Sequence, residues 1–259
     1  MINQTRAAIV TGGAGSIGSA TLARLVARDI NVLVVDKDAH QLEKITGKFS
    51  RDRVITFACD ATDPQGVARA TDLAKSRFGR IDALVNVAGG AGPVKADEIE
   101  DIDIKTWDHV IDLNIKSTFL FCRAVVSAMK ARGYGRIANF SSIIARGEKG
   151  PPTTVAARLP YATAKAALLG FTAQLAKDLA PHGITVNVLL PGLILGDKGT
   201  RIRERFEALP ADQKSAMIAA YPIGRAGEAD EVAAAVEFLV SEAAGYITGS
   251  ELAVDGAYL

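Results

Sequence analysis

The sequence predicts an α/β fold in which helices cover both faces of a doubly wound parallel sheet of about seven strands. Short β-branched segments alternate with longer segments of helical periodicity, which is the order expected of right-handed β-α-β crossovers. Several of the short segments are apolar on both faces, as in parallel strands that are covered on both sides. The 259 residues, of which 49% are hydrophobic, are enough for one large core, so we expect a single domain over residues 1–259.

The predicted elements follow one another regularly. Strands are expected at residues 7–10, 32–35, 54–58, 83–87, 136–140, 185–190 and 251–254. Helices are expected at residues 17–28, 41–49, 65–78, 107–132, 161–180 and 230–241. Residues 143–160 and 193–222 show neither pattern, and long irregular segments of compact domains are usually functional loops. We therefore expect a variable substrate loop or lid at 193–222.

The composition excludes several classes of protein. Lys plus Arg (30) balance Asp plus Glu (29) to a net charge of +1, so no nucleic-acid partner is indicated. No apolar stretch is long enough to cross a bilayer and the N-terminus does not resemble a signal peptide, so we expect a cytoplasmic protein without a membrane partner. The two cysteines and three isolated histidines indicate neither a disulfide framework nor a metal site.

A glycine-rich turn follows the first strand and reads T-G-G-A-G-S-I-G from Thr11 to Gly18. Glycines in such a turn let the backbone approach a pyrophosphate, and the N-terminus of the next helix supplies free N–H groups. This arrangement is typical of a Rossmann-type sheet that binds a dinucleotide. The predicted phosphate-binding residues are Gly12, Gly15, Ser16, Ile17 and Gly18.

The second strand ends at Asp36, whose carboxylate can accept hydrogen bonds from the adenosine ribose and would repel a 2′-phosphate. No arginine stands at Gly15, so NAD is favoured as cofactor and NADP is less expected. Lys37 is the contrary indication, because a lysine can pair with a phosphate.

Further polar and small residues follow the next two strands. Because ligands of open α/β sheets bind outside the carboxyl ends of the strands, these residues are expected to complete the cofactor site. They are Asp60 and Ala61 after the third strand, and Asn86, Ala88 and Gly89 at the end of the fourth.

Tyr161 and Lys165 lie one helical turn apart, on the same face of a predicted helix. A free tyrosine has a pKa of about 10, and a lysine cation held close lowers it. Such a pair can give and take a proton in a carbonyl–alcohol reaction. Taken alone, the Y-x-x-x-K pattern is weak evidence, because it occurs by chance on many helices.

Taken in order, the motifs resemble those of the short-chain dehydrogenase/reductase family, single-domain type, over nearly the whole chain. The glycine turn is similar to T-G-x-x-x-G-x-G, with Ser16 where glycine is usual, and the segment from Asn86 to Gly89 is similar to N-N-A-G, with Val87 replacing an asparagine. Further matches are Asn114, Ser142, the Tyr161–Lys165 pair, Pro191-Gly192, Pro222-Ile223-Gly224-Arg225, Tyr246-Ile247-Thr248-Gly249 and Val254-Asp255-Gly256.

The resemblance implies a catalytic set. It assigns Tyr161 as general acid and base, Ser142 as hydrogen-bond donor to the reacting oxygen, and Lys165 as the residue that lowers the pKa of Tyr161 and holds the nicotinamide ribose. It assigns to Asn114 a water that connects Lys165 to solvent. Tyr161 and Lys165 therefore also count as cofactor-binding residues, together with Pro191, Gly192 and Ile194.

Two further departures from the family pattern concern the site. Gly196 stands where a threonine often touches the nicotinamide carboxamide. The segment between Ser142 and Tyr161 is longer than is common in the family and holds Gly147, Gly150, Pro151 and Pro152. We expect it to shape the mouth of the substrate site, although surface insertions can also be idle.

We therefore predict an oxidoreductase that transfers a hydride between NAD(H) and a secondary alcohol or ketone. One alternative is an NADPH-dependent reductase of 3-oxoacyl thioesters of acyl-carrier protein or CoA, whose phosphates the basic segment 201–205 would attract unless it is a solvated helix face. Another is a non-catalytic nucleotide-sensing protein, which the intact set Asn114, Ser142, Tyr161 and Lys165 disfavours. A homo-oligomer, tetramer or dimer, is expected because the apolar helices 107–132 and 163–180 resemble those that pack between subunits of the family.

Overall fold

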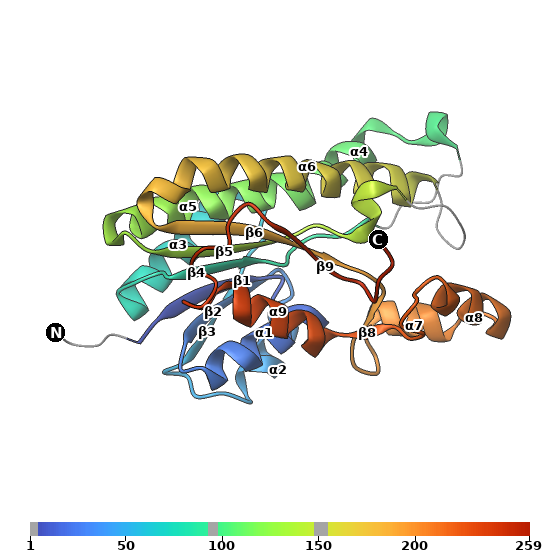
Figure 1. The fold of residues 1–259 in the computed structure, drawn as a ribbon. Helices are drawn as coiled ribbons and strands as arrows, with labels where there is room; N and C mark the ends of the chain where they lie inside the picture. Colours follow the sequence, from blue (N-terminus) through green and yellow to red (C-terminus); the bar gives the residue numbers. More distant parts are fainter. Residues whose placement is uncertain (1–4, 93–97, 148–154) are drawn as a thin grey trace.

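Seven parallel strands form the centre of the computed structural model, which describes residues 5–92, 98–147 and 155–259 (Figure 1). Their order in the sheet is β3-β2-β1-β4-β5-β6-β9, and every neighbouring pair is parallel. The strands are β1 (Ala7–Thr11), β2 (Asn31–Asp36), β3 (Val54–Ala58), β4 (Ala83–Asn86), β5 (Gly135–Phe140), β6 (Ile184–Pro191) and β9 (Glu251–Val254). The predicted doubly wound sheet is confirmed, and each strand lies where it was predicted to within a few residues.

Helices cover both faces of the sheet (Figure 1). One face carries α1 (Ser16–Ala27), α2 (Ala39–Thr46) and α9 (Ala229–Leu239), and the other carries α3 (Pro64–Phe78), α4 (Ile104–Ile111), α5 (Ser117–Arg132) and α6 (Val155–Leu179). Successive residues of a strand enter different cores: Val10 packs with the first group of helices and Ile9 with the second. Burial on both faces is why central strands such as β1 and β2 are rich in apolar residues.

The helix predicted at 107–132 begins earlier, at Ile104, and contains a π-helical turn, η2 (Asp112–Lys116), between α4 and α5. Side chains bond the carbonyls in and around this turn: the Asn114 amide donates to the Val110 carbonyl at 2.8 Å, and the Ser117 hydroxyl donates to the Leu113 carbonyl at 2.6 Å. Such turns often occur at functional sites. The periodicity of the sequence does not reveal this one.

The prediction that 143–160 is irregular was wrong at both ends. Residues Ile143–Arg146 form a short 3₁₀ helix, η3, and α6 begins at Val155 rather than Tyr161. The irregular segment was expected to extend to Pro160, whereas this proline, which lacks an N–H, lies inside the first turns of α6. Residues 148–154, with Gly150, Pro151 and Pro152, lie outside the described residues, so the role expected of this insertion stays a prediction.

The prediction that 193–222 is irregular was also wrong. This segment holds β7 (Ile194–Leu195), which pairs with β8 (Gly227–Glu228), and the helices α7 (Arg201–Glu207) and α8 (Ala211–Ala219). The helices are too short to show a clear period in the sequence. They extend away from the main body of the protein (Figure 1).

The strand order reverses between β1 and β4, which pair with Thr11 opposite Asn86. In open α/β sheets the crevice outside the carboxyl ends of the strands at such a reversal is where ligands bind. The glycine turn follows β1 and the Asn86–Gly89 segment ends β4, so the fold brings two predicted cofactor segments to this crevice.

Three short 3₁₀ helices, η1 (Ile99–Asp101), η3 and η4 (Ala180–His182), complete the elements of the described chain. Across residues 5–92, 98–147 and 155–259, no helix has the length and apolarity required to cross a bilayer. The same residues contain no cluster of His, Cys, Asp and Glu suited to a metal ion. Cys59 and Cys122 are free thiols.

Candidate active site

The glycine turn packs tightly against the segment that follows β4. Gly12 has φ +61°, and a Cβ there would lie 2.7 Å from the Ala88 nitrogen. The Ala88 N–H donates to the Thr11 hydroxyl at 3.2 Å. Gly18 is equally confined, because its Cβ would lie 2.3 Å from the Gly12 carbonyl oxygen. Glycine is therefore required at position 12 by backbone conformation and close approach, and at position 18 by close approach alone.

The N-terminus of α1 is suited to an anion. Helices α2, α3 and α4 are each preceded by an aspartate whose carboxylate accepts hydrogen bonds from the first turn: Asp38, Asp63 and Asp103. By contrast, α1 is preceded by Gly15, which has no side chain to cap the helix, and its first turn contains no acidic residue. The N–H groups that other helices satisfy with a carboxylate are thus left for a ligand. This glycine cradle fits the pyrophosphate of a dinucleotide.

Asp36 lies beside this turn. Its Oδ2 accepts the Ala14 N–H and its Oδ1 accepts the Asp38 N–H, both at 3.1 Å. These two bonds hold the carboxylate at the end of β2, and each oxygen retains a lone pair for a further donor. The neighbouring Lys37 is exposed.

The predicted residues after β3 lie at the same edge of the sheet. The Asp60 carboxylate accepts the Thr62 N–H and hydroxyl, each at 2.8 Å, and the bond from the Thr62 N–H is the main cause that lowers the pKa of Asp60. Ala61 is half-buried next to it. The carboxylate is therefore held in its ionised form by its own turn.

The Asn86 side chain does not face the crevice that was predicted for it. Its Nδ2 donates to Asn139 Oδ1 at 2.9 Å, and Asn139 Nδ2 donates to the Thr172 hydroxyl at 3.0 Å. Cys122 lies 3.5 Å from Asn86 Nδ2 and completes this buried cluster. The cluster ties β4, β5 and α6 together through Asn86 Nδ2, whereas the buried Asn86 Oδ1 has no hydrogen-bond partner among the described residues.

Lys165 is the centre of the site. Its side chain is buried, with 3% of the residue exposed, and its Nζ donates to the Phe140 carbonyl at 2.7 Å. The same Nζ lies 5.4 Å from the centre of the Tyr161 ring. A Cβ on Gly89 would lie 3.2 Å from Lys165 Nζ and 2.6 Å from Asn114 Oδ1. Segments from β4, η2, β5 and α6 therefore meet within one small volume.

Asn114 holds the loop after β4. Its Oδ1 accepts the Gly90 N–H at 3.0 Å, and its Nδ2 donates to the carbonyls of Gly90 and Val110, both at 2.8 Å. Both amide hydrogens are thus used within the protein. The water that the resemblance places at Asn114 stays a prediction.

Ser142 ends the β5 segment and begins η3, where its half-buried hydroxyl accepts the Ile144 N–H at 3.4 Å. The preceding residue, Ser141, is buried and donates its hydroxyl to the Lys165 carbonyl at 2.7 Å. This bond fixes the end of β5 against α6. The roles of Ser141 and of the Phe140 carbonyl were not predicted from the sequence, although Ser141 directly precedes Ser142 after the strand.

Burial changes the charge expected of Lys165. The loss of hydration lowers the pKa of Lys165 to about 7, because burial favours the neutral amine and no carboxylate among the described residues offsets it. A lysine cation beside Tyr161 was predicted from the sequence, whereas the burial of Lys165 shifts the balance toward its neutral amine.

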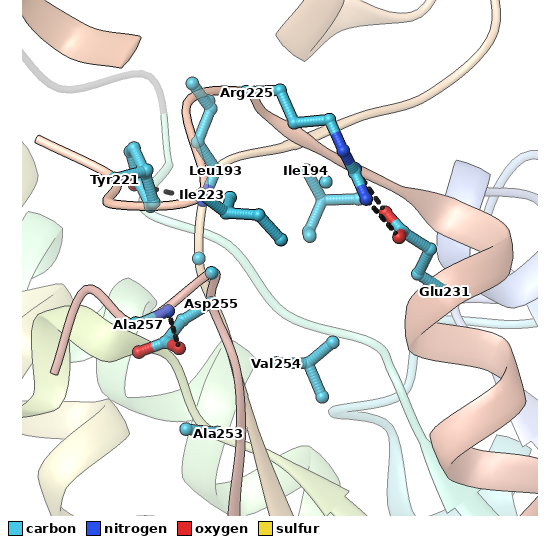
Figure 2. Close-up of a pocket in the computed structure, with 13 residues that line it drawn as sticks. Leu193, Ile194, Tyr221, Ile223, Arg225, Glu231, Ala253, Val254, Asp255 and Ala257 are labelled. Atoms are coloured by element: carbon cyan, nitrogen blue, oxygen red, sulfur yellow. Dashed lines mark hydrogen bonds and ion pairs between the residues drawn. The ribbon is translucent and has the colours of Figure 1, made fainter. Parts of the chain in front are cut away.

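Residues 192–194 border a hollow of about 350 Å³. A Cβ on Gly192 would lie 2.9 Å from the Tyr221 ring, and the Leu193 N–H donates to the Tyr221 hydroxyl at 3.0 Å. Figure 2 shows Ile194 and Val254 facing the hollow, with the Arg225–Glu231 ion pair (2.7 Å) at its side. Ser142, Tyr161 and Lys165 are not among its lining residues, so it is separate from the Tyr161–Lys165 centre.

Gly89→Ala is expected to disrupt the centre by sterics alone. The added methyl group would displace the Asn114 amide and the Lys165 ammonium, so we expect at least a tenfold loss of activity and a stability loss of about 1–3 kcal/mol. Gly170→Ala is the matched control, because a Cβ at this position of α6 meets nothing within 4 Å, and it should leave activity unchanged. Thermal unfolding and a rate assay measure both effects. Equal behaviour of the two variants would contradict the packing described.

Comparison with known proteins places the chain among oxidoreductases. The family model described as Enoyl-(Acyl carrier protein) reductase matches residues 12–258. The chain is 37% identical to the short-chain reductase protein NovJ of Streptomyces niveus, over 98% of this chain and 94% of that protein. It is 34% identical to D-threitol dehydrogenase of Mycolicibacterium smegmatis, with 98% and 92% covered, and 36% identical to 3-oxoacyl-[acyl-carrier-protein] reductase FabG of Salmonella typhimurium, with 96% and 95% covered.

A solved structure supports the same assignment at the level of the fold. The crystal structure of levodione reductase superposes with a TM-score of 0.86 and 28% sequence identity. The match covers 97% of this chain and 96% of that one, so the correspondence includes the sheet, both helical layers and the segments that meet at Lys165.

Proposed function

The chain belongs to the short-chain dehydrogenase/reductase family of oxidoreductases, and we propose that it transfers a hydride between NAD(H) and a secondary alcohol or ketone. The observation that carries this proposal is the buried Lys165 side chain, whose Nζ lies 2.7 Å from the Phe140 carbonyl and 5.4 Å from the centre of the Tyr161 ring. Burying a lysine without a carboxylate partner costs folding free energy, so a lysine in this position is usually functional.

The roles follow from where charge develops. When bound, a nicotinamide cofactor supplies or accepts the hydride. In reduction, negative charge grows on the substrate oxygen; the Tyr161 hydroxyl gives its proton to this oxygen, and in oxidation it takes the proton back. The Ser142 hydroxyl donates a hydrogen bond to the same oxygen. Lys165, whose pKa lies at about 7, exchanges a proton near neutral pH and so returns Tyr161 to its starting state.

The glycine cradle of α1, with Gly12, Gly15, Ser16, Ile17 and Gly18, would hold the pyrophosphate. Asp36 would accept the ribose hydroxyls, and Asp60, Ala61, Ala88 and Gly89 would border the adenosine and ribose moieties. Pro191, Gly192 and Ile194 would border the nicotinamide. We also propose that residues 193–222, with α7 and α8, act as a lid over the substrate.

Side-by-side titration with NADH and NADPH tests the cofactor preference. We expect NADH to bind about tenfold more tightly, because a carboxylate at the end of β2 repels a 2′-phosphate. Asp36→Asn should reduce this preference about tenfold, whereas Asp72→Asn, which removes an exposed carboxylate from α3, should not. Quenching of protein fluorescence reports both affinities. A wild-type preference for NADPH would mean that Lys37 outweighs Asp36.

A 3-oxoacyl thioester reductase is the second candidate, because the chain is 36% identical to an enzyme of that name. The basic segment of α7 gives it little support. Arg203 Nε donates to the Gly196 carbonyl, and its guanidinium pairs with Glu207 at 3.5 Å. Rates with acetoacetyl-CoA and with simple cyclic and open-chain ketones separate the two candidates. A preference for the thioester with NADPH would favour the second.

We propose that the protein is a homo-oligomer, a tetramer or dimer, and that it acts in the cytoplasm. The helices α4 and α5 carry exposed apolar side chains: Ile104 is 72% exposed and Phe119 is 45% exposed. A pair of such helices gains stability by packing against a second copy. Light scattering on the purified protein measures the number of subunits.

A further inference from the structure

Two departures from the family pattern, Ser16 and Gly196, contact each other in space. Gly196 lies between β7 and α7, far from α1 in the sequence. A Cβ built on Gly196 would lie 1.9 Å from Ser16 Oγ and 2.5 Å from Ser16 Cβ, far inside contact distance. The Ser16 side chain therefore occupies the space that a side chain at position 196 would need.

Space, rather than backbone conformation, is what requires glycine at this position. Gly196 is absent from the glycines with positive φ among the described residues, whereas the nearby Gly199 has φ +86°. Any residue could adopt the backbone of Gly196, so its restriction comes from its neighbours. Besides Ser16, the Thr200 hydroxyl would lie 3.1 Å from the added Cβ.

The segment around Gly196 has little freedom to move aside. Its carbonyl accepts a hydrogen bond from Arg203 Nε, which ties it to α7. The Thr200 hydroxyl donates to the Asp197 carbonyl at 2.7 Å and stiffens the same turn. A side chain at position 196 would thus meet Ser16 on one side and a braced turn on the other.

The Ser16 hydroxyl stands at the N-terminus of α1. Ser16 is the first residue of this helix, next to the uncapped N–H groups of the glycine cradle. Its own carbonyl accepts the Ser19 hydroxyl at 3.0 Å, but the Ser16 hydroxyl has no hydrogen-bond partner within residues 5–92, 98–147 and 155–259. A half-buried hydroxyl at this place is a donor available to an anion.

We propose that Ser16 is a cofactor-positioning residue that donates its hydroxyl hydrogen to the pyrophosphate, and that Gly196 is glycine because Ser16 fills its side-chain space. Ser16 thus adds a polar contact from α1, where the family pattern has a glycine, and its side chain excludes a larger residue from position 196. Because the Gly196 carbonyl also anchors α7 through Arg203, the pair links the cradle to the base of the proposed lid. This inference rests on the proposed function.

Five variants separate the steric from the hydrogen-bonding part: Ser16→Gly, Ser16→Ala, Gly196→Thr and the two double variants Ser16→Gly/Gly196→Thr and Ser16→Ala/Gly196→Thr. Thermal unfolding without ligand reports the steric pairing, and NADH titration by fluorescence reports the hydrogen bond. Gly196→Thr alone should lower the Tm by about 5 °C or more, or prevent folding, because overpacking has nowhere to relax. The double variant Ser16→Gly/Gly196→Thr should regain most of this loss.

Ser16→Ala tests the hydroxyl by itself. It should bind NADH about tenfold more weakly with little change in Tm, since a hydrogen bond to a charged group is lost while the methyl group keeps the space filled. Combined with Ser16→Ala, Gly196→Thr should remain unstable, because the Ser16 Cβ position is itself 2.5 Å away.

Additive effects on Tm in the Ser16→Gly/Gly196→Thr cycle would overturn the steric pairing. An unchanged NADH affinity in Ser16→Ala would overturn the role of the hydroxyl. A wild-type protein that bound neither NADH nor NADPH would instead contradict the proposed function, and the Tm cycle of the ligand-free protein would still decide whether the two positions are coupled.

Discussion

Tyr161→Phe is expected to lower kcat by about 10³-fold or more, at the upper end of what general acid–base catalysis contributes. The substitution removes one oxygen and leaves the ring, which lies 5.4 Å from Lys165 Nζ, in place. The proton transfer to and from the substrate oxygen then has no donor at the correct position. Steady-state kinetics with a reactive ketone and NADH measure the loss.

Tyr246→Phe is the matched control, because Tyr246 is fully exposed and lies between α9 and β9, away from Lys165. It should change kcat by less than about twofold, since surface substitutions rarely matter. Tyr161→Phe should keep its NADH affinity and its Tm within error of the wild type. A Tyr161→Phe protein with more than a tenth of wild-type kcat would remove Tyr161 from the proposed mechanism.

Lys165→Met is expected to abolish activity and to change how stability depends on pH. The pKa of Lys165 is lowered from 10.5 to about 7 by burial. Between these two values the unfolded chain binds one proton more than the folded one, so this group makes the wild type more stable as the pH rises, by up to about 1.4 kcal/mol per pH unit. Below pH 7 both states are protonated and the dependence ends.

The variant loses this dependence. The difference in free energy of unfolding, Lys165→Met minus wild type, should therefore be largest near pH 7 and should decrease as the pH rises toward 9. Burial raises the pKa of Cys122 to about 12, which acts with the opposite sign above pH 9, but it acts equally in both proteins and cancels in the difference. Urea unfolding between pH 6 and 9 supplies the data.

Lys177→Met, an exposed position near the end of α6, is the control for the loss of a lysine. If Lys165→Met and Lys177→Met showed the same pH profile, the buried amine would not be exchanging its proton in this range. The proton-return role of Lys165 would then fail, whatever the loss of kcat. A pH profile that differs from wild type only for Lys165→Met supports both the burial of Lys165 and its proposed role in returning the proton to Tyr161.

Much of the fold was predictable because its signals are local. The middle of β2 is apolar on both faces, and α3 begins with a proline that follows an aspartate, so the alternation of elements could be recognised in the sequence. The failures were also local. The start of α6 was predicted at Tyr161 instead of Val155, and α7 and α8 were too short to show a period.

The residues of the candidate site were predictable from the sequence, but their contacts and charge were not. The order of motifs named Asn114, Ser142, Tyr161 and Lys165, and the fold brings Lys165 next to Tyr161, with Asn114 across Gly89. Nothing in the motifs indicated that Ser141 clamps the backbone of Lys165. That bond joins residues 24 positions apart and exists only once β5 and α6 are packed.

By itself, the sequence determined the parallel sheet, the glycine cradle and the one-turn spacing of Tyr161 and Lys165, because each depends on neighbours within a few residues. Three features were decided only by the tertiary structure. The Asn86 side chain bonds Asn139, and Lys165 is shielded from solvent. Ser16 fills the space that a side chain at position 196 would need. Burial and steric exclusion are properties of atoms brought together from distant segments, so they come into being when the sheet and its helices assemble.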